Sequence, residues 1–305
     1  AGGLWRSLDA GETWVNAGTD KGLPLCGVSS VAIDPNNSLT NWFVSTGNGD
    51  PMPGRFWAQN SIGVGRTMDG GNSWKIIGLQ NVHQMRKIIL TYYQNYLHLF
   101  VATTNGVYEC ENGLSSNPQW SKLLDGNFYD IEFDLINNGI IYASGTGSNV
   151  SVHKIDWINN LYSVLPNLSS IPVENGRRIS IEMSGAAPDY IFIVATYRGG
   201  LETSFLYRYK LSTNEILYKG ELPFSYVSPI QGVGPEKAMG WAVSPTFNGG
   251  NELIMVYGNT APIRKSSNLL DNIPCTWSNV TSGYFNCEIH VDMHYMIFED
   301  DGQTL

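Results

Sequence analysis

The chain is poor in basic residues and in charge of either sign. Lys and Arg account for only 18 of its 305 residues, against 27 Asp and Glu, so the formal net charge is −9. Because a nucleic-acid surface needs clustered Lys and Arg, this balance argues against nucleic acid as a partner. The sequence also has no apolar run near the roughly 20 residues that a helix needs to cross a bilayer. We therefore expect no nucleic-acid partner and no membrane span in this segment.

Several familiar motifs are missing as well. There is no G-x-x-x-x-G-K phosphate loop, no G-x-S-x-G nucleophile elbow and no H-E-x-x-H zinc motif. Apolar residues do not recur at the i, i+3, i+4, i+7 spacing of an amphipathic helix over any useful length. These absences exclude the corresponding enzyme classes and argue against a helical domain.

Cysteine is scarce, with four residues at positions 26, 110, 275 and 287. Cys275 and Cys287 are close enough in sequence to bridge neighbouring strands of one hairpin, and two buried thiols are the alternative. Because no histidine stands at a zinc-like interval from this pair, the spacing argues against a structural zinc site.

Glycine and aromatic residues are abundant. The chain has 33 glycines, and Trp, Tyr and Phe make up 12% of it, whereas charged residues reach 15%. Many turns and large cross-strand aromatics suit β-sheets. A length of 305 residues can hold one large β domain, and we expect residues 1–305 to form a single domain.

The most informative pattern is an eight-residue repeat, S-L-D-A-G-E-T-W at 7–14 and T-M-D-G-G-N-S-W at 67–74. Asp9 and Asp69 can accept hydrogen bonds from amides of their own turn, and Gly11 and Gly71 supply positive φ. The hydroxyls can bond across the turn and each Trp begins the return strand. The structural positions of the pattern are Ser7, Asp9, Gly11, Thr13, Trp14, Thr67, Asp69, Gly71, Ser73 and Trp74.

These residues resemble the Asp-box, or BNR, repeat of sialidases, sortilin-type receptors, two-propeller xyloglucanases and many secreted bacterial β-propellers. Weaker copies are G-V-Y-E-C-E-N-G followed by Trp120, with Asn112 at the Asp position, and the stretch 271–277 around Asp271. The resemblance implies a β-propeller in which these turns are structural, so their residues are not expected to be catalytic.

A second resemblance concerns A-G-G-L-W-R-S, V-A-I-D-P-N-N, V-S-T-G-N-G-D and H-V-D-M-H. These strings are similar to parts of secreted bacterial repeat proteins with a C-terminal secretion domain of the Bacteroidetes type. The similarity covers most of residues 1–145 and the last twenty residues. It implies that the chain is a segment of a longer protein, secreted or placed at the cell surface.

The strand pattern repeats every 45 to 60 residues or so, as propeller blades do. Five complete four-stranded units are expected between 28 and 280, flanked by the second half of one unit and the first half of another, which begins within 288–300. We therefore predict an all-β propeller of four-stranded antiparallel blades, six or seven in number, with the ring closed by the N- and C-terminal strands. The expected first pairs are 28–34 with 42–46, 85–91 with 99–103, 129–133 with 140–144, 179–183 with 190–196 and 238–244 with 253–257. The turn-bearing hairpins are expected at 63–77, 106–124, 150–165, 205–218 and 263–280.

Candidate binding residues follow from this fold. The first strand of each propeller blade lines the central channel, so polar residues at its start face one mouth of that channel. Such residues could bind a polar or anionic ligand, or could simply line a water-filled channel. They are His83, Gln84, Asp130, Arg177, Arg178, Lys237 and His290. The Gly- and Pro-rich loop 47–62 adds Phe56 and Trp57, which could stack on a sugar, contact a partner or cover a neighbouring blade.

His290, Asp292 and His294 form a candidate metal site. In a strand, side chains at i, i+2 and i+4 project from one face, and two imidazoles with a carboxylate suit zinc. Neighbouring same-face residues are however nearly 7 Å apart, about twice the rise per residue. A bulge, or help from another blade, would be needed for one ion to reach all three. A hydrogen-bonded channel cluster and a catalytic role are the alternatives, and no other cofactor is expected.

Hydrolysis of a glycoside needs two carboxylates across a cleft. Asp130 and Asp292 are candidates, but nothing in the sequence places them opposite each other. The R-I-P motif and arginine triad of sialidases are not recognisable. We therefore favour a propeller that binds an extracellular polysaccharide or protein without catalysis. The alternatives are a glycoside hydrolase of the two-propeller xyloglucanase type and a structural module of a surface adhesin or filament.

Overall fold

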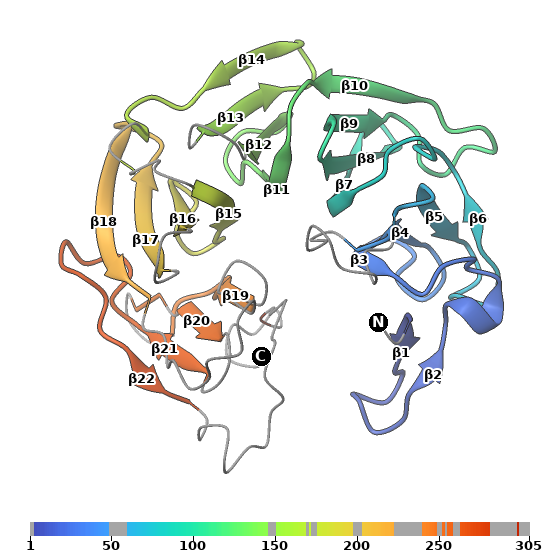
Figure 1. Ribbon diagram of the computed structural model, residues 1–305, viewed down its shortest axis with the longest axis horizontal. Helices are drawn as coiled ribbons and strands as arrows, with labels where there is room; N and C mark the ends of the chain where they lie inside the picture. The colour runs from blue at the N-terminus through green and yellow to red at the C-terminus, as the bar shows by residue number, and fades with distance from the viewer. Residues whose placement is uncertain are drawn as a thin grey trace. The chain divides into compact units, whose positions relative to one another are not determined.

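The computed structural model describes residues 3–48, 60–145, 151–168, 171, 176–197, 203–222, 240–248, 252–253, 255–258, 263–280 and 298. For residues 176–178, 197, 203, 257 and 258 it describes the backbone alone. In this part of the chain nearly all regular structure is β-strand, and one short 3-10 helix, η1 (Thr19–Lys21), is the only helix (Figure 1). The expected absence of α-helix is therefore confirmed for the described residues.

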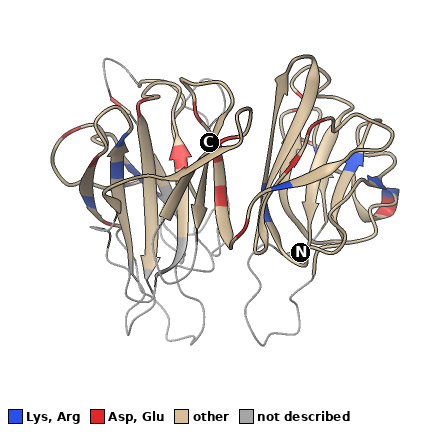
Figure 2. Ribbon diagram, turned by 90° about the horizontal axis from the view of Figure 1, so that it is seen from above, with Lys and Arg blue, Asp and Glu red and all other residues tan. Residues whose placement is uncertain are grey.

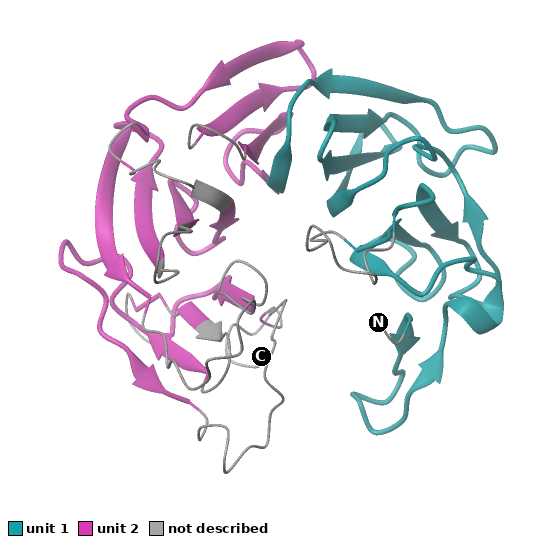
Figure 3. Cartoon of the chain, viewed as in Figure 1, with its two compact units in different colours: residues 1–131 teal, residues 132–305 magenta. Residues whose placement is uncertain are grey.

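The chain divides into two compact units, residues 1–131 and 132–305, and the boundary falls within strand β11 (Figure 3). The strands up to that boundary are β1 (Trp5–Arg6), β2 (Val15–Asn16), β3 (Val28–Ile33), β4 (Trp42–Thr46), β5 (Val64–Thr67), β6 (Lys75–Ile76), β7 (Met85–Tyr93), β8 (Tyr96–Thr103), β9 (Gly106–Cys110), β10 (Trp120–Leu124) and β11 (Phe128–Phe133). The later strands are β12 (Ile140–Gly145), β13 (Ser151–Asp156), β14 (Leu161–Val164), β15 (Gly176–Met183), β16 (Tyr190–Tyr197), β17 (Thr203–Lys210), β18 (Glu215–Glu221), β19 (Gly240–Val243), β20 (Met255–Gly258), β21 (Arg264–Ser266) and β22 (Ser278–Asn279).

Within the described residues, the strands form five four-stranded sheets and one two-stranded sheet. Each four-stranded sheet contains four consecutive strands paired in chain order, beginning at β3, β7, β11, β15 and β19. Every pairing for which a register is defined is antiparallel, for example that of β7 with β8. This meander is the blade of a β-propeller, and the predicted class of four-stranded blades is confirmed.

The predicted number of blades is wrong. The described residues form five four-stranded blades, not six or seven, and β1 and β2 pair with each other in a separate two-stranded sheet. The segment 288–300, expected to begin a closing blade, lies outside the described residues except for Phe298. Phe298 packs with Ala242, Val256 and Ile263 of the last blade. The prediction of six or seven blades assumes that strands from the N- and C-terminal ends of the chain form one sheet. The described residues show no such sheet.

The hydrophobic cores lie between neighbouring blades. In unit 1, Phe43 and Val64 pack with Met85 and Leu99, which joins the blade β3–β6 to the blade β7–β10. In unit 2, one cluster joins β12 and β13 to β15, β16 and β17, and another joins β16 and β17 to β19 and β20. Because these three clusters each join two successive sheets, the stability of the blades concerned depends on their neighbours.

Each repeated turn joins the last two strands of its sheet, and its side-chain hydrogen bonds lie within eight residues. Asp69 Oδ1 accepts the amides of Asn72 at 3.0 Å and Ser73 at 2.9 Å, and Oδ2 accepts the Ser73 hydroxyl at 2.6 Å. Thr67 Oγ1 accepts the amide of Gly71 at 2.9 Å, and Gly71 has a φ of +84°. The predicted amide-to-carboxylate bonds and positive φ are therefore present in this turn.

The turn at 7–14, between β1 and β2, has three of the four bonds, and the Glu12 amide donates to the Asp9 carbonyl instead. Asp9 Oδ1 accepts the Thr13 amide at 2.9 Å, Oδ2 accepts the Thr13 hydroxyl at 2.5 Å, and Ser7 Oγ accepts the Gly11 amide at 2.7 Å. The bonds that Asp9 accepts from the Thr13 hydroxyl, from the Ser7 hydroxyl at 2.7 Å and from the Thr13 amide lower its pKa to about 2. The carboxylates of both turns are thus occupied by their own backbone, which is a structural role.

A third turn of this kind joins β21 to β22. Asn268 Oδ1 accepts the Ser266 hydroxyl at 2.8 Å and the Thr276 amide at 3.0 Å, and Trp277 follows. The weak sequence match in this region was centred on Asp271, whereas the structure assigns the carboxylate position to Asn268. An insertion between Asn268 and Thr276 hides the pattern in the sequence, because the turn is longer than eight residues.

Arginines on β1, β5 and β17 donate to turn carbonyls of the following sheet. Arg6 Nη1 donates to the carbonyl of Gly70, and Arg66 Nη1 donates to those of Gly113 and Ser115 at 2.6 and 2.7 Å. In unit 2, Arg208 Nη1 donates to the carbonyls of Leu269, Leu270 and Asp271. The nearby Lys219 is fully buried, and its Nζ donates to the carbonyls of Asn268, Asp271 and Ile273. These cations therefore satisfy turn carbonyls that have no strand partner.

Charged residues occupy scattered positions on the strands and turns (Figure 2), in keeping with the low charged fraction of the sequence. Among the described residues there is no helix with the length and apolarity that crossing a bilayer requires.

Candidate functional site on the first strands of unit 1

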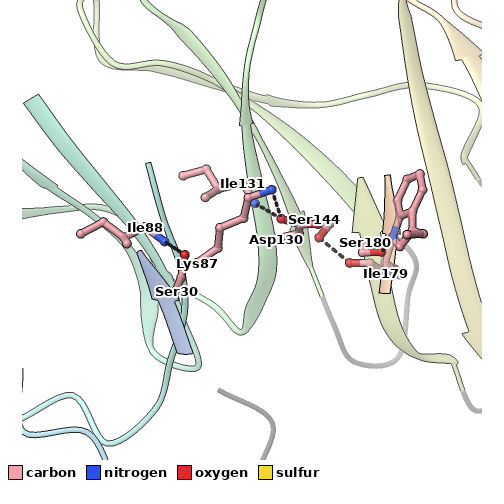
Figure 4. A network of polar contacts seen from close by, with 9 residues as sticks. Ser30, Lys87, Ile88, Asp130, Ile131, Ser144, Ile179 and Ser180 are labelled. Carbon is pink, nitrogen blue, oxygen red and sulfur yellow. Dashed lines mark hydrogen bonds and ion pairs between the residues drawn. The ribbon is translucent and has the colours of Figure 1, made fainter. Parts of the chain in front are cut away.

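An ion pair joins the first strands of two neighbouring blades. Lys87 on β7 and Asp130 on β11 approach each other with Nζ and Oδ1 2.8 Å apart (Figure 4). The Asp130 Oδ1 also accepts the amide of Ile131 at 2.9 Å. The two side chains keep 19% and 11% of their surface exposed. This pair is therefore largely desolvated yet reachable from solvent.

A β-bulge at the start of β7 places a second cation beside this pair. Met85 pairs with Thr103 and Lys87 with Ala102, so Arg86 is the extra residue of the bulged strand. Its guanidinium lies 4.6 Å from the centre of the Tyr129 ring, and its Nη1 donates to the Phe128 carbonyl at 3.2 Å. Bulges re-aim side chains and are over-represented beside functional sites. Here the bulge directs two consecutive basic residues to β11.

The same irregularity recurs in other first strands. The register shifts between Val28 and Ser30 on β3, and between Gly176 and Arg178 on β15. The extra residues are Ser29 in unit 1 and Arg177 in unit 2. A bulge thus lies at the start of β3, β7 and β15, and on β7 and β15 its extra residue is arginine.

Serines on the first and second strands make side-chain bonds to the next blade (Figure 4). In unit 1, Ser30 Oγ accepts the amide of Ile88 at 3.2 Å. In unit 2, Ser144 Oγ donates to the Ile179 carbonyl at 2.5 Å, and Trp241 Nε1 donates to Ser180 Oγ at 2.6 Å. These serines hold adjacent blades together, so part of the polar character of the first strands is structural.

Of the residues predicted from the sequence, Asp130 is the one that the structure brings into a cluster. Gln84 and His83 precede β7, and the structure describes only backbone bonds for them: their carbonyls accept the amides of Thr104 at 3.2 Å and Ser61 at 2.8 Å. Arg177 and Arg178 lie on β15, where the backbone alone is described. The other predicted residues lie outside the described part of the chain: Phe56, Trp57, Lys237, His290, Asp292, His294 and Cys287.

The sequence prediction missed Arg86 and Lys87. Both follow Gln84 closely in a strand that begins M-R-K-I-I-L, and the signal was two consecutive basic residues ahead of an apolar run. Their orientation depends on the bulge, which the sequence does not show. For the metal hypothesis, the described residues contain no group of three or more His, Cys, Asp or Glu side chains placed to hold an ion, and the predicted triad is not among these residues.

The cluster offers donors and acceptors side by side. A lysine ammonium presents three donors and an ionised carboxylate presents about four acceptor positions, so the pair can hydrogen-bond a group that both donates and accepts. The Arg86 guanidinium over Tyr129 adds a flat, cationic surface. Such an arrangement can bind a hydroxyl-rich ligand, whereas a carboxylate already held by a lysine and an amide is poorly placed to act alone as a catalytic acid.

Solved structures share this architecture. An ancestral GH74 enzyme matches with a TM-score of 0.63 and 18% identity, over 93% of this chain and 36% of that enzyme. YCF48 from Cyanidioschyzon merolae matches with a TM-score of 0.52 and 10% identity, over 84% of this chain and 72% of that chain. The Dos1 propeller matches with a TM-score of 0.50 and 12% identity, over 90% of this chain and 63% of that chain.

The present chain thus spans about a third of the length of the GH74 enzyme. No protein-family model matches the chain, and no curated protein matches it. Identities this low establish shared architecture and not shared activity. The chain is a repeat protein with the β-propeller fold, built of five four-stranded blades within its described residues.

Proposed function

We propose that this chain is the ligand-binding β-propeller of a secreted or cell-surface protein and that it binds an extracellular polysaccharide through Lys87, Asp130 and Arg86. The observation that carries the proposal is the ion pair between β7 and β11, which is largely buried but still open to solvent. Secretion rests on the resemblance of the two Asp-containing turns, and of the strings around them, to exported repeat proteins.

Sugar hydroxyls match this cluster chemically. Each hydroxyl donates one hydrogen bond and accepts others, so two neighbouring hydroxyls can bridge a Lys and an Asp side chain. Hydrogen bonds to charged groups contribute about 1.5–3 kcal/mol each, which is sufficient to orient a sugar in a shallow site. The half-buried Tyr129 ring beside Arg86 supplies apolar surface for the C–H face of the same sugar.

Hydrolysis is the alternative function, and the GH74 enzyme among the structural neighbours motivates it. Glycosidases place two carboxylates roughly 5 to 9.5 Å apart. Asp130 instead has a lysine at 2.8 Å, an arrangement that suits binding better. A structural role in an adhesin or filament would require no ligand at this cluster.

The proposal is tested by measuring binding of the purified chain to a panel of plant and microbial polysaccharides by affinity electrophoresis and calorimetry. We expect Lys87→Met and Asp130→Asn each to weaken binding about tenfold or more. The control is Lys122→Met, because Lys122 also forms an ion pair, with Asp125 at 2.8 Å, but on the exposed fourth strand β10. This control should bind as the unaltered chain does.

Two results would contradict the proposal: no polysaccharide of the panel binds, or the Asp130→Asn variant binds with unchanged affinity. Release of reducing ends from the same polysaccharides decides the alternative. Hydrolysis by the unaltered chain that Asp130→Asn abolishes would establish the glycosidase function instead.

A further inference from the structure

We infer that unit 2 carries a second, separate binding pocket, and that this pocket takes a neutral sugar residue. A cavity of about 610 Å³ lies against both the β11–β14 and the β15–β18 blades. Its walls come from β12, β13 and β14, from the turn after β11, and from the turns before β16 and β18. This volume is typical of small-molecule sites. The cavity shares no residue with the Lys87–Asp130 cluster, so the inference goes beyond the proposed function.

Asp134 lines this cavity but keeps few acceptor positions for a ligand. Its Oδ1 accepts the amides of Ile136 and Asn137, both at 2.8 Å. Its Oδ2 accepts the Asn137 side-chain amide at 3.1 Å and the Tyr142 hydroxyl at 2.8 Å. Burial raises the pKa of Asp134, but these four bonds outweigh it and hold the pKa below the usual value. The carboxylate is therefore charged and has its acceptor positions filled.

Asp189, Asn214 and Lys154 supply the groups that can contact a ligand. Asp189 accepts the Ser212 amide at 2.8 Å and the Ser212 hydroxyl at 2.6 Å, one on each oxygen. Asn214 Oδ1 accepts the Tyr209 hydroxyl at 2.9 Å. Among the described residues, none donates to the remaining lone pairs of Asp189 and none accepts from the Asn214 side-chain amide. With the Lys154 ammonium, the cavity thus presents one acceptor and two donors.

The rim of the cavity is apolar. Ile136 and Val164 line it and expose 55% and 53% of their surface, although both are large aliphatic residues. Pro166 and Leu211 complete this surface. A pyranose ring has hydroxyls around its edge and C–H groups on its faces, so it matches a pocket with convergent polar groups and an aliphatic wall.

The charges of the cavity select a neutral ligand. Two carboxylates, Asp134 and Asp189, face a single lysine, Lys154. A phosphate or a uronic acid would meet a net negative site and be repelled, because like charges in partly desolvated surroundings cost free energy. A neutral sugar accepts from Lys154 and Asn214 and donates to Asp189 without that cost.

The test is a titration of the chain with cellotetraose, mannotetraose and, as the acidic probe, trigalacturonic acid. Calorimetry is carried out in the Lys87→Met background, so that binding at the first-strand cluster does not contribute. We expect at least one neutral tetrasaccharide to bind and the acidic probe not to bind. Adding Lys154→Met should weaken the neutral binding about fivefold or more, whereas the matched control Lys75→Met, an exposed lysine outside the cavity, should leave it unchanged.

A second measurement uses the unaltered chain, so that loss of binding cannot be confused with misfolding of a variant. The side-chain amide resonances of Asn214, assigned with Asn214→Ala, should shift on addition of the neutral probe to the otherwise unaltered chain. The inference is overturned if neither neutral probe binds in the Lys87→Met background, if Lys154→Met binds as Lys75→Met does, or if the Asn214 resonances stay unchanged at saturation. Loss of polysaccharide binding in Lys87→Met with retention of tetrasaccharide binding would separate this site from the proposed function.

Discussion

At the scale of single residues, cations perform two different tasks in this protein. Arg66 is nearly buried and its Nη1 holds two turn carbonyls of the following blade. Lys87 is also largely buried but pairs with a carboxylate that solvent can reach. The first arrangement saturates backbone groups and stabilises the fold. The second places a charged pair where solvent can reach it, and there we propose that a ligand binds.

The structural role of Arg66 gives a stability prediction. Arg66→Ala leaves the carbonyls of Gly113 and Ser115 without their donor, and we expect a loss of about 3 kcal/mol in the free energy of unfolding. Exposed Lys122→Ala removes a surface ion pair with Asp125 and a cation–π contact with Tyr108, and should cost about 1 kcal/mol. Urea unfolding of both variants measures the difference. Equal losses would show that the Arg66 contacts do not stabilise the fold.

The carboxylate of Asp9 gives a pH prediction. Its pKa is lowered from 3.8 to about 2 by the Thr13 hydroxyl, the Ser7 hydroxyl and the Thr13 amide. A lowered folded pKa contributes stability that is present above the unfolded pKa and is lost as the pH falls through the folded value. We therefore expect the free energy of unfolding to decrease from about pH 4 to about pH 2. Asp9→Asn should reduce this dependence, and urea unfolding across that range measures it; an unchanged slope would refute the assignment.

At the scale of elements, the Asp-containing turns owe their shape to glycine as much as to aspartate. Gly71 has a φ of +84°, and a Cβ there would lie 2.8 Å from the Ala17 Cβ, 3.0 Å from the Trp42 ring and 3.1 Å from the Ala17 carbonyl oxygen. Trp74 donates its Nε1 to that same Ala17 carbonyl at 2.6 Å. The turn is therefore packed against the preceding sheet, and its glycine meets both a conformational and a steric requirement.

Gly22 provides a matched control for this point. Its φ of +91° is similar to that of Gly71, but a Cβ at Gly22 would meet nothing within 4 Å. We expect Gly22→Ala to cost about 1 kcal/mol from backbone strain alone, and Gly71→Ala to cost about 2–4 kcal/mol because of the added clash. Thermal unfolding of both variants separates the cost of backbone strain from the cost of the steric clash. A smaller loss for Gly71→Ala would show that the sheet yields to the new methyl group.

At the scale of the whole molecule, the large hydrophobic clusters lie between neighbouring blades. Each large core cluster contains residues of two successive sheets, and the boundary between the two compact units falls inside the single strand β11. A cut at that boundary would divide this strand. That residues 1–305 behave as one domain stays a prediction.

This prediction can be tested by calorimetry. We expect one cooperative unfolding transition with equal calorimetric and van't Hoff enthalpies for the 305-residue chain. Two separated transitions, or a calorimetric enthalpy well above the van't Hoff value, would show that the units unfold independently. Far- and near-ultraviolet circular dichroism recorded over the same temperatures should give coincident curves.

The sequence by itself determined the β class, the four-stranded units and the bonds of the two turns at 7–14 and 67–74. These features are local. The hydroxyl, Asp, Gly and Trp that form each turn lie within eight residues, and apolar runs in the sequence indicate the strands. The Asn268 turn was not recognised because its insertion breaks that spacing, although two of its hydrogen bonds correspond to those of the other turns.

Only the tertiary structure decided the number of blades, the partners of the first-strand residues and the position of the second cavity. Lys87 and Asp130 are 43 residues apart, and they meet because a bulge at Arg86 turns the start of β7 toward β11. Asp134 and Asn214 line one cavity because two blades pack together. A bulge or a packing contact arises from register and burial across sheets, and neither leaves a pattern in the neighbouring residues of the chain.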